Sequence, residues 1–187
     1  MAEFPSVEVI ITAFNGRDFL EACVSSVLNS DYSPLTVIIV DNNSKDGSVE
    51  TVAERFHYAT NLRIIRNSKN LGFAEGTNVG IRAGKAEFLM FLNQDTRVDR
   101  RCLSEIVRTF ESDDAIGALQ SKLLLYDEPQ TFHNSGGFID KYGYACARGL
   151  AERDVGQYDR EDEIFFSVGA AMAVRRRALN EVGMFDK

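Results

Sequence analysis

The side chains with the clearest chemical potential are those of Asn93, Gln94 and Asp95, which directly follow the apolar run at positions 88–92. A run this short fits a strand that is covered on both faces, as in a parallel sheet. The polar triplet would then lie at the carboxyl end of the strand, where open α/β sheets hold their ligands. A carboxylate at that edge can coordinate a hard divalent cation, although Asn and Asp also end strands as ordinary turn residues.

Three further polar clusters follow segments that predict strands, at residues 12–15, 41–44 and 67–78. In a doubly wound sheet such strand ends line one crevice, so we expect a single ligand site built from all four clusters. The first strand is not followed by G-x-G-x-x-G, and the chain has no G-x-x-x-x-G-K-[ST]. The dinucleotide-binding fingerprint and the phosphate loop are therefore excluded.

The elements that must position these clusters alternate between strand and helix along the chain. This alternation predicts an α/β fold with a doubly wound, mostly parallel mixed sheet and helices on both faces. We expect Ser48 to cap the second helix. The apolar patterns predict strands at 7–14, 36–40, 62–66, 88–92 and 116–120, and helices at 18–29, 48–56, 74–84 and 99–110.

The sequence changes in character after position 125. Residues 126–163 contain five glycines and many charges without a helical period, which predicts loops and a hairpin over the carboxyl edge of the sheet. A final apolar strand is predicted at 164–174. The run Arg175–Arg177 then begins a helix, and we interpret it as a solvated helix turn, with a site for phosphate or an anionic lipid-linked acceptor as the alternative.

Composition narrows the class of protein. The chain has 187 residues, of which 44% are hydrophobic, and a formal net charge of -7. A general nucleic-acid or anionic-membrane surface needs a net basic face, so the acidic charge argues against both kinds of surface. Cys23, Cys102 and Cys146 form no C-x-x-C pair, which favours neither a disulfide framework nor a zinc site. Cys23 lies on the apolar stripe of the first predicted helix, so we interpret it as a core residue rather than a nucleophile.

The N-terminal residues do not resemble a signal peptide, because an acidic side chain stands where a basic one is usual. No apolar run approaches the roughly 20 residues of a membrane span, so we expect no transmembrane segment. These features predict a cytoplasmic protein, with peripheral attachment at the inner face of the membrane as a variant of that location.

Five segments of the chain, in order, resemble the signatures of family 2 glycosyltransferases with the GT-A fold. The match is closest to the rhamnosyltransferase-like branch and extends from Val7 to Lys187. Its segments are V-E-V-I-I-T-A-F-N-G (7–16), V-I-I-V-D-N-N-S-K-D-G-S (37–48), N-L-G-F-A-E-G-T-N-V-G-I (70–81), F-L-M-F-L-N-Q-D-T (88–96) and S-V-G-A-A-M-A-V-R-R-R-A-L-N-E-V-G-M-F-D (167–186).

The resemblance implies a UDP- or dTDP-sugar as donor and Mn²⁺ or Mg²⁺ as cofactor. Asp41 would accept a hydrogen bond from the pyrimidine base, and its alternative role is an Asx turn. Asn93 and Asp95 align with the first and last positions of the D-x-D motif, so Asn93 would face the ribose and Asp95 would bind the metal. Gln94 would be a spacer, because alternate residues of a strand point to opposite faces. The implied nucleotide-sugar site comprises Thr12, Ala13, Phe14, Asn15, Asp41, Asn43, Asn70, Gly72, Asn78, Asn93, Gln94 and Asp95.

The glycines between positions 72 and 80 and the histidine at position 133 each allow two interpretations. Gly72, Gly76 and Asn78 are candidates for close approach of the backbone to the nucleotide-sugar, but Gly76 and Gly80 lie four apart and could instead let a helix pack tightly on the sheet. We interpret His133 as a loop residue near the acceptor rather than as a catalytic base.

The activity implied by the resemblance is inverting transfer of a sugar to an acceptor hydroxyl. Rhamnose added to a cell-surface polysaccharide or to a lipid-linked glycan would fit this branch. Residues 1–125 would form the nucleotide-sugar-binding half, and residues 126–187 the acceptor side of the same domain. The general base is expected beyond Lys187, so the chain as given should be truncated and inactive. The alternatives are a binding module that does not turn over, and a sugar nucleotidyltransferase, which the residues at 12–15 disfavour because they lack a G-T-R-type loop.

Overall fold

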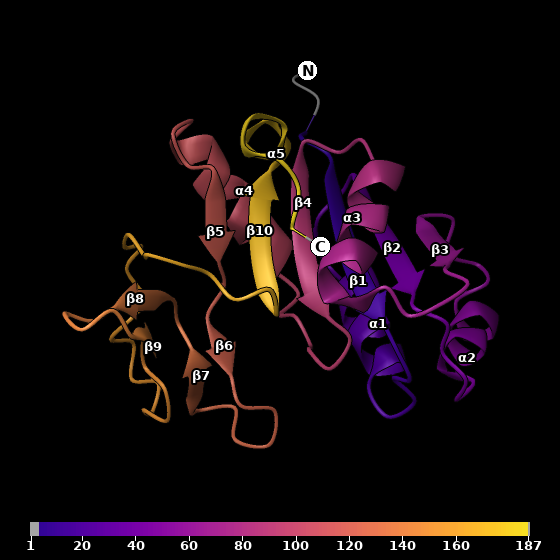
Figure 1. Ribbon diagram of the computed structural model, residues 1–187, viewed down its shortest axis with the longest axis horizontal. Coiled ribbons are helices and arrows are strands. Elements are labelled where there is room, and N and C mark those ends of the chain that lie inside the picture. Colours follow the sequence, from indigo (N-terminus) through magenta and orange to yellow (C-terminus); the bar gives the residue numbers. More distant parts are fainter. Residues whose placement is uncertain (1–3, 187) are drawn as a thin grey trace.

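The computed structural model describes residues 4–186, and within them six strands form one central sheet in the order β3-β2-β1-β4-β10-β5 (Figure 1). Residues 1–3, which belong to the stretch examined for a targeting signal, and Lys187, where the family resemblance ends, lie outside the described residues. The strands of this sheet are β1 (Val7–Ala13), β2 (Leu35–Asp41), β3 (Leu62–Arg66), β4 (Phe88–Asn93), β5 (Ala118–Gln120) and β10 (Ala171–Arg175).

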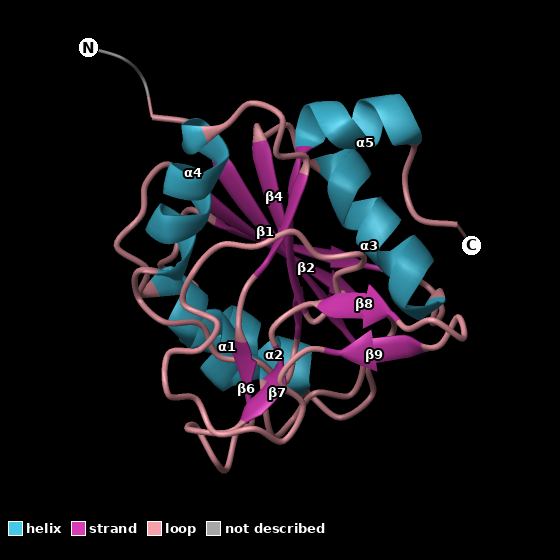
Figure 2. Cartoon of the chain, turned by 90° about the vertical axis from the view of Figure 1, so that its left-hand side faces the viewer, coloured by secondary structure: helices cyan, strands magenta, loops and turns pink. Residues whose placement is uncertain are grey.

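Two layers of helices cover the sheet because its strands are apolar on both faces. In β1, Val9 and Ile11 belong to the core on the side of α1, α2 and α4, whereas Ile10 belongs to the core beneath α3 and α5. Figure 2 shows the two helix groups on opposite sides of the strands. The helices are α1 (Leu20–Leu28), α2 (Ser48–Arg55), α3 (Gly72–Ala83), α4 (Cys102–Ser112) and α5 (Arg176–Val182).

The predicted α/β fold with a mostly parallel mixed sheet is confirmed. Strands β1 to β4 pair in parallel, and β10 pairs antiparallel with both β4 and β5. Beyond the lower end of β4 and β10 in Figure 1 lie two hairpins, where one was predicted. They are formed by β6 (Leu123–Leu124) with β7 (Phe132–Asn134) and by β8 (Gly137–Ile139) with β9 (Ala145–Ala147).

The last strand is shorter than the predicted segment 164–174. It occupies Ala171–Arg175, because the preceding residues hydrogen-bond elsewhere. The backbone N–H of Phe165 donates to the carbonyl of Gly137, and that of Val168 donates to the side chain of Gln120. An apolar run alone therefore overestimated the length of this strand.

Helix starts also differ from the predictions by a few residues. Gly47, with φ 79°, is the residue that precedes α2, so Ser48 is its first helical residue rather than its N-cap. The Ser48 hydroxyl instead donates to the Asp46 carboxylate at 2.6 Å. The helix predicted from position 99 begins at Cys102, and the Asp99 carboxylate accepts the N–H of Arg101 at 2.8 Å. Asp46 and Asp99 thus each accept a backbone N–H two residues on, from Ser48 and Arg101, at the start of a helix.

Arg175 is not part of a solvated turn, which corrects the interpretation of the arginine run. Its side chain is 5% exposed, and its guanidinium lies 5.1 and 5.2 Å from the ring centroids of Phe88 and Phe110. It donates hydrogen bonds to the carbonyls of Phe110, Asp113 and Ile116. These donors are therefore used inside the protein and do not form an anion site.

Arg176 is likewise structural, and only the third arginine is exposed. Arg176 pairs with the buried carboxylate of Glu8 at 2.9 Å and donates to the carbonyls of Ile81 and Ala86. The side chain of Arg177 is 54% exposed. The alternative of a phosphate or acceptor site on this run is accordingly not supported by the positions of Arg175 and Arg176.

The glycines of α3 let this helix lie close to the sheet. A Cβ atom at Gly76 would lie 2.7 Å from Cγ2 of Thr12, and one at Gly80 would lie 2.5 Å from Cγ2 of Ile10. Contacts this short are not tolerated, so the packing alternative holds for both positions. Gly72 differs, because its Cβ would meet nothing within 4 Å but its φ of 77° favours glycine.

Gly80→Ala should destabilise the protein even though alanine is the better helix former. The substitution would gain about 1 kcal/mol of helix propensity. The new methyl group would collide with Ile10 and Val40 inside the core, and overpacking of this kind typically costs about 1–3 kcal/mol. We therefore expect a lower urea midpoint, and an increased midpoint would show that helix and sheet can separate without cost.

Candidate functional site

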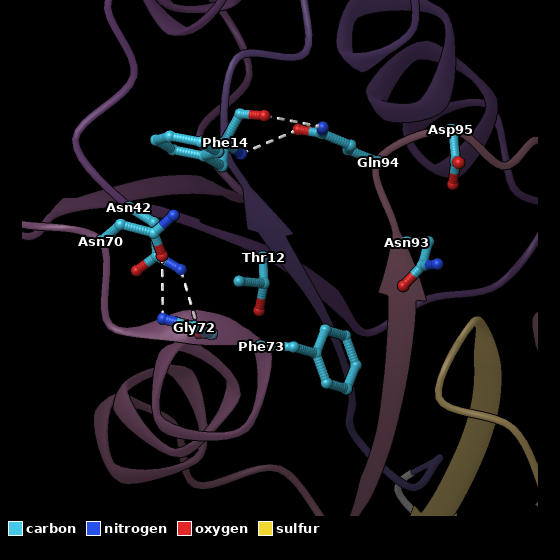
Figure 3. Close-up of a pocket in the computed structure, with 9 residues that line it drawn as sticks. All are labelled: Thr12, Phe14, Asn42, Asn70, Gly72, Phe73, Asn93, Gln94 and Asp95. Carbon is cyan, nitrogen blue, oxygen red and sulfur yellow. Dashed lines mark hydrogen bonds between the residues drawn. The ribbon is translucent and has the colours of Figure 1, made fainter. Parts of the chain in front are cut away.

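A pocket of about 270 Å³ lies at the carboxyl ends of β1 and β4, next to the N-terminus of α3. Figure 3 shows Asn93 and Asp95 on one side of it and Asn70 and Gly72 on the other. The pocket is lined by Thr12, Phe14, Asn42, Asn70, Gly72, Phe73, Asn93, Gln94 and Asp95.

All four polar clusters read from the sequence contribute to this pocket. Seven of the residues assigned to the site line it, namely Thr12, Phe14, Asn70, Gly72, Asn93, Gln94 and Asp95. Sequence reasoning missed two lining residues, Asn42 and Phe73. The remaining assigned residues, Ala13, Asn15, Asp41, Asn43 and Asn78, are not among the lining residues.

Asp41 and Asn15 connect the loops behind the pocket. The buried Asp41 carboxylate accepts the N–H of Ser44, three residues further on, at 2.8 Å, and so closes the loop after β2. The Asn15 N–H donates to Oγ of Ser44 at 3.1 Å, and its side-chain carbonyl accepts the N–H of Lys45 at 2.9 Å. The two loops that follow β1 and β2 are thus tied to each other.

Asn42 holds the N-terminus of α3 in place through hydrogen bonds. Only 2% of this residue is exposed. Its Oδ1 accepts hydrogen bonds from the side chain of Asn67 and the N–H of Leu71, and its Nδ2 donates to the carbonyl of Gly72 at 3.0 Å. The neighbouring Asn43 has a φ of 67° and contacts Lys45 instead. The sequence Asp41-Asn42-Asn43 contains two adjacent asparagines, and nothing local in it predicts which of them contacts α3.

Asn78, in α3, does not line the pocket, and its carboxamide is fully engaged by other groups. It is 2% exposed, its Oδ1 accepts the N–H of Phe185 at 3.1 Å, and its Nδ2 donates to the carbonyl of Phe185 at 2.8 Å. Nδ2 also lies 3.2 Å from Oε2 of Glu75. These partners satisfy the hydrogen-bonding groups of the Asn78 side chain without a bound ligand.

Gln94 is more than a spacer. Figure 3 shows its side chain directed at Phe14, whereas Asn93 and Asp95 lie apart from it. The carboxamide accepts the Phe14 N–H at 3.0 Å and donates to the Phe14 carbonyl at 3.0 Å. This pair of bonds holds the first residue after β1, and Gly16 leaves the room that the carboxamide needs, because a Cβ at Gly16 would lie 2.5 Å from Oε1.

Gln94→Ala should weaken ligand binding in the pocket without abolishing it. Loss of two partly exposed hydrogen bonds, each about 0.5–1.5 kcal/mol, would free the Phe14 backbone. Affinity for a nucleoside diphosphate, measured by calorimetry, should fall by about tenfold. A loss as complete as that of Asp95→Ala would mean that Gln94 contacts the ligand or its metal directly.

Asp95 is the only carboxylate among the pocket-lining residues, and it is exposed. Among residues 4–186 no three His, Cys, Asp or Glu side chains gather into a group that could hold a metal ion. A single carboxylate with neighbouring amide oxygens fits a cation that takes its other ligands from a diphosphate and water, as Mg²⁺ usually does. The residues present therefore fit a metal that arrives with a diphosphate, and Asp95 would hold it.

Neither Cys23 nor His133 lines the pocket, although the Cys23 thiol donates to the carbonyl of the lining residue Asn93 at 3.5 Å. Cys23 is fully buried in the core, and burial raises the pKa of its thiol to about 12, so it stays protonated at neutral pH. His133 is exposed on β7 and does not line the pocket. Within the described part of the chain, no helix has the length and apolar character needed to cross a membrane.

Comparisons with known proteins agree with this geometry. Residues 8–183 match the model of glycosyl transferase family 2. An uncharacterized glycosyltransferase of Haemophilus influenzae is 27% identical over 130 residues, which are 70% of this chain and 40% of that protein. The chain thus spans less than half the length of this curated relative.

Two solved structures share the fold. A mannosyltransferase of Pyrobaculum calidifontis, in complex with GDP-Man and Mn²⁺, has a TM-score of 0.71 at 19% identity and covers 97% of this chain and 48% of that one. The structure of GalNAc-T7 with UDP, GalNAc and Mn²⁺ has a TM-score of 0.76 at 17% identity and covers 98% and 37%. The fold is accordingly of the GT-A type. Since the family model matches nearly the whole chain, the protein belongs to glycosyl transferase family 2.

Proposed function

We propose that this protein binds a nucleoside-diphosphate sugar in the pocket at the ends of β1 and β4 and transfers the sugar to an acceptor hydroxyl. The observation that carries the proposal is the meeting of four separate segments, each following a strand of the sheet, around one pocket that holds a single carboxylate. Membership of glycosyl transferase family 2 supports the reaction class. The two structural neighbours contain GDP-Man or UDP together with Mn²⁺, which supports the donor class.

The charges around the pocket support binding of a diphosphate that brings its own cation. The chain carries a formal charge of -7, so a free diphosphate would be repelled. The N-terminus of α3 at Gly72 offers the positive end of a helix dipole. Asp95 would hold Mn²⁺ or Mg²⁺, which stabilises the negative charge of the leaving diphosphate when bound. The side-chain oxygen of Asn93 would accept a hydrogen bond from a ribose hydroxyl. The nucleoside would face Thr12, Phe14 and the loop of Asp41.

The stereochemistry, the donor sugar and the acceptor are proposed from the resemblance to rhamnosyltransferase-like motifs. We propose an inverting single displacement, in which a carboxylate base deprotonates the acceptor hydroxyl. Rhamnose from a dTDP- or UDP-sugar is the proposed donor group, and a glycan or lipid-linked glycan at the cytoplasmic face of the membrane is the proposed acceptor. The general base is proposed to lie downstream of residue 187.

Calorimetric titration of UDP, dTDP and GDP tests the donor site. We expect binding with Mn²⁺ and little binding with a chelator, because only the metal offsets repulsion between the diphosphate and the acidic protein. Equal affinity in both conditions would overturn the metal assignment, and no binding of any diphosphate would overturn the donor site.

Sugar transfer is measured separately, with a radiolabelled donor and a longer chain that includes the downstream residues. The longer chain should transfer sugar, and residues 1–187 should bind the donor without transferring it. Donor binding without transfer by the longer chain as well would favour a binding module that does not turn over. Equal turnover by both chains would place the base within residues 1–187.

A further inference from the structure

One wall of the pocket is an exposed aromatic ring that is held by residues distant in the sequence. Phe73, the second residue of α3, lines the pocket and is 41% exposed. A Cβ at Gly169 would lie 2.8 Å from Cε1 and Cζ of Phe73, so the ring lies directly against the backbone of Gly169. The ring of Phe185 lies edge-on to Phe73, with 6.5 Å between centroids. The segment after α5 therefore reaches the pocket through this ring.

Phe185 is itself fixed on two sides. Its ring lies 5.2 Å from the ring of Phe91, which is fully buried in β4. Its backbone N–H and carbonyl both bond to the carboxamide of Asn78, at 3.1 and 2.8 Å. Because the Asn78 amide pairs with both backbone groups of Phe185, it fixes where Phe185 lies along α3 and how far Phe185 lies from α3. Figure 1 shows the chain returning from α5 toward α3 to make this contact.

We propose that Asn78 is a positioning residue that holds Phe185 against Phe73 and thereby fixes this wall of the donor pocket. The inference rests on the proposed function, because it concerns the same pocket. If Phe185 moves away, the exposed Phe73 ring loses its neighbour on one side and can occupy other rotamers. A ligand must then order the ring as it binds, which lowers its affinity. By thermodynamic reciprocity, a ligand in the pocket must stabilise the contact between Asn78 and Phe185 by the same factor.

The first test compares affinities for UDP, or for the diphosphate that binds most tightly, in the presence of Mn²⁺. Asn78→Ala removes both hydrogen bonds, and Phe185→Ala removes the ring without altering α3. Each should raise the Kd by about 5- to 20-fold, the range of moderate coupling between sites. Asn78→Asp keeps an acceptor for the Phe185 N–H but sets a buried carboxylate against the Phe185 carbonyl and Oε2 of Glu75, so the Kd should rise at least as much as in Asn78→Ala. Val107→Ala, in the buried core on the other side of the sheet, is the control for a general loss of stability and should leave the Kd unchanged.

The second test is hydrogen exchange of the Phe185 amide. If Asn78 only stabilised the fold, ligand binding would not change this exchange rate. Binding of the diphosphate to the unaltered chain should slow exchange of the Phe185 amide, which donates to Asn78, by about the same 5- to 20-fold factor. Exchange in the Val107→Ala variant should slow equally.

The outcomes separate the two proposals. No diphosphate binding by the unaltered chain would overturn the proposed function, and this inference with it. Binding by the unaltered chain, with the same Kd in Phe185→Ala and in folded Asn78→Ala, would overturn this inference alone. Exchange of the Phe185 amide that does not respond to the ligand would also overturn it.

Discussion

Asp95→Ala should abolish the Mn²⁺-dependent part of nucleoside-diphosphate binding, with a loss of at least about 10- to 100-fold in affinity, as seen when even outer-shell partners of a metal are removed. Among residues 4–186, Asp95 is the only carboxylate that lines the pocket, so no other described acid there can replace it. Without the cation, the diphosphate meets a protein of formal charge -7. Calorimetry with Mn²⁺ and with a chelator measures the effect, and the variant should show the same weak binding in both.

Two variants make the Asp95 experiment specific. Asp127→Ala removes an exposed acid from the loop between β6 and β7 and should leave the affinity unchanged. Asp95→Asn keeps the shape of the side chain but loses its charge, so it should resemble Asp95→Ala if charge is what holds the metal. Full metal-dependent binding by Asp95→Ala would show that the cation is held elsewhere.

Arg175→Ala should lower the free energy of unfolding by about 3 kcal/mol or more, because it breaks a buried hydrogen-bond network. The guanidinium lies against the stacked rings of Phe88 and Phe110, whose centroids are 4.7 Å apart. Its loss leaves a cavity beside these rings and three carbonyl groups with one partner fewer. The ion pairs contribute little, because their carboxylates on Glu87 and Asp114 are largely exposed. Urea unfolding followed by circular dichroism measures the change.

The next residues of the arginine run supply the controls. Arg177→Ala changes a side chain that is 54% exposed and should alter stability by no more than about 0.5 kcal/mol. Arg175→Lys keeps the charge but lacks the planar, forked guanidinium that donates to three carbonyls beside the stacked rings, so it should remain clearly destabilised. If Arg175→Ala and Arg177→Ala had equal small effects, the buried position of Arg175 would be wrong.

The sequence by itself determined the fold class and the edge of the sheet at which the pocket lies. Short apolar runs that end in Asp or Asn are a local property of the chain, and in a parallel sheet the carboxyl ends of strands meet at one edge. For this reason the pocket contains residues of all four predicted clusters, including Thr12, Asn70 and Asp95. The fold class follows in the same way, because alternating strand and helix patterns permit few other arrangements.

Tertiary structure alone decided what the polar side chains near these motifs contact. Asn78 and Phe185 are 107 positions apart, and Arg175 and Phe110 are 65 apart, so neither pairing leaves a local pattern in the sequence. The same holds for β10, whose place between β4 and β5 is set by pairing with distant strands. A buried polar group must find a partner, but the identity of that partner depends on which segments the fold brings together. The sequence therefore predicts that such residues matter, and only the packed structure separates those that line the pocket from those that hold its walls.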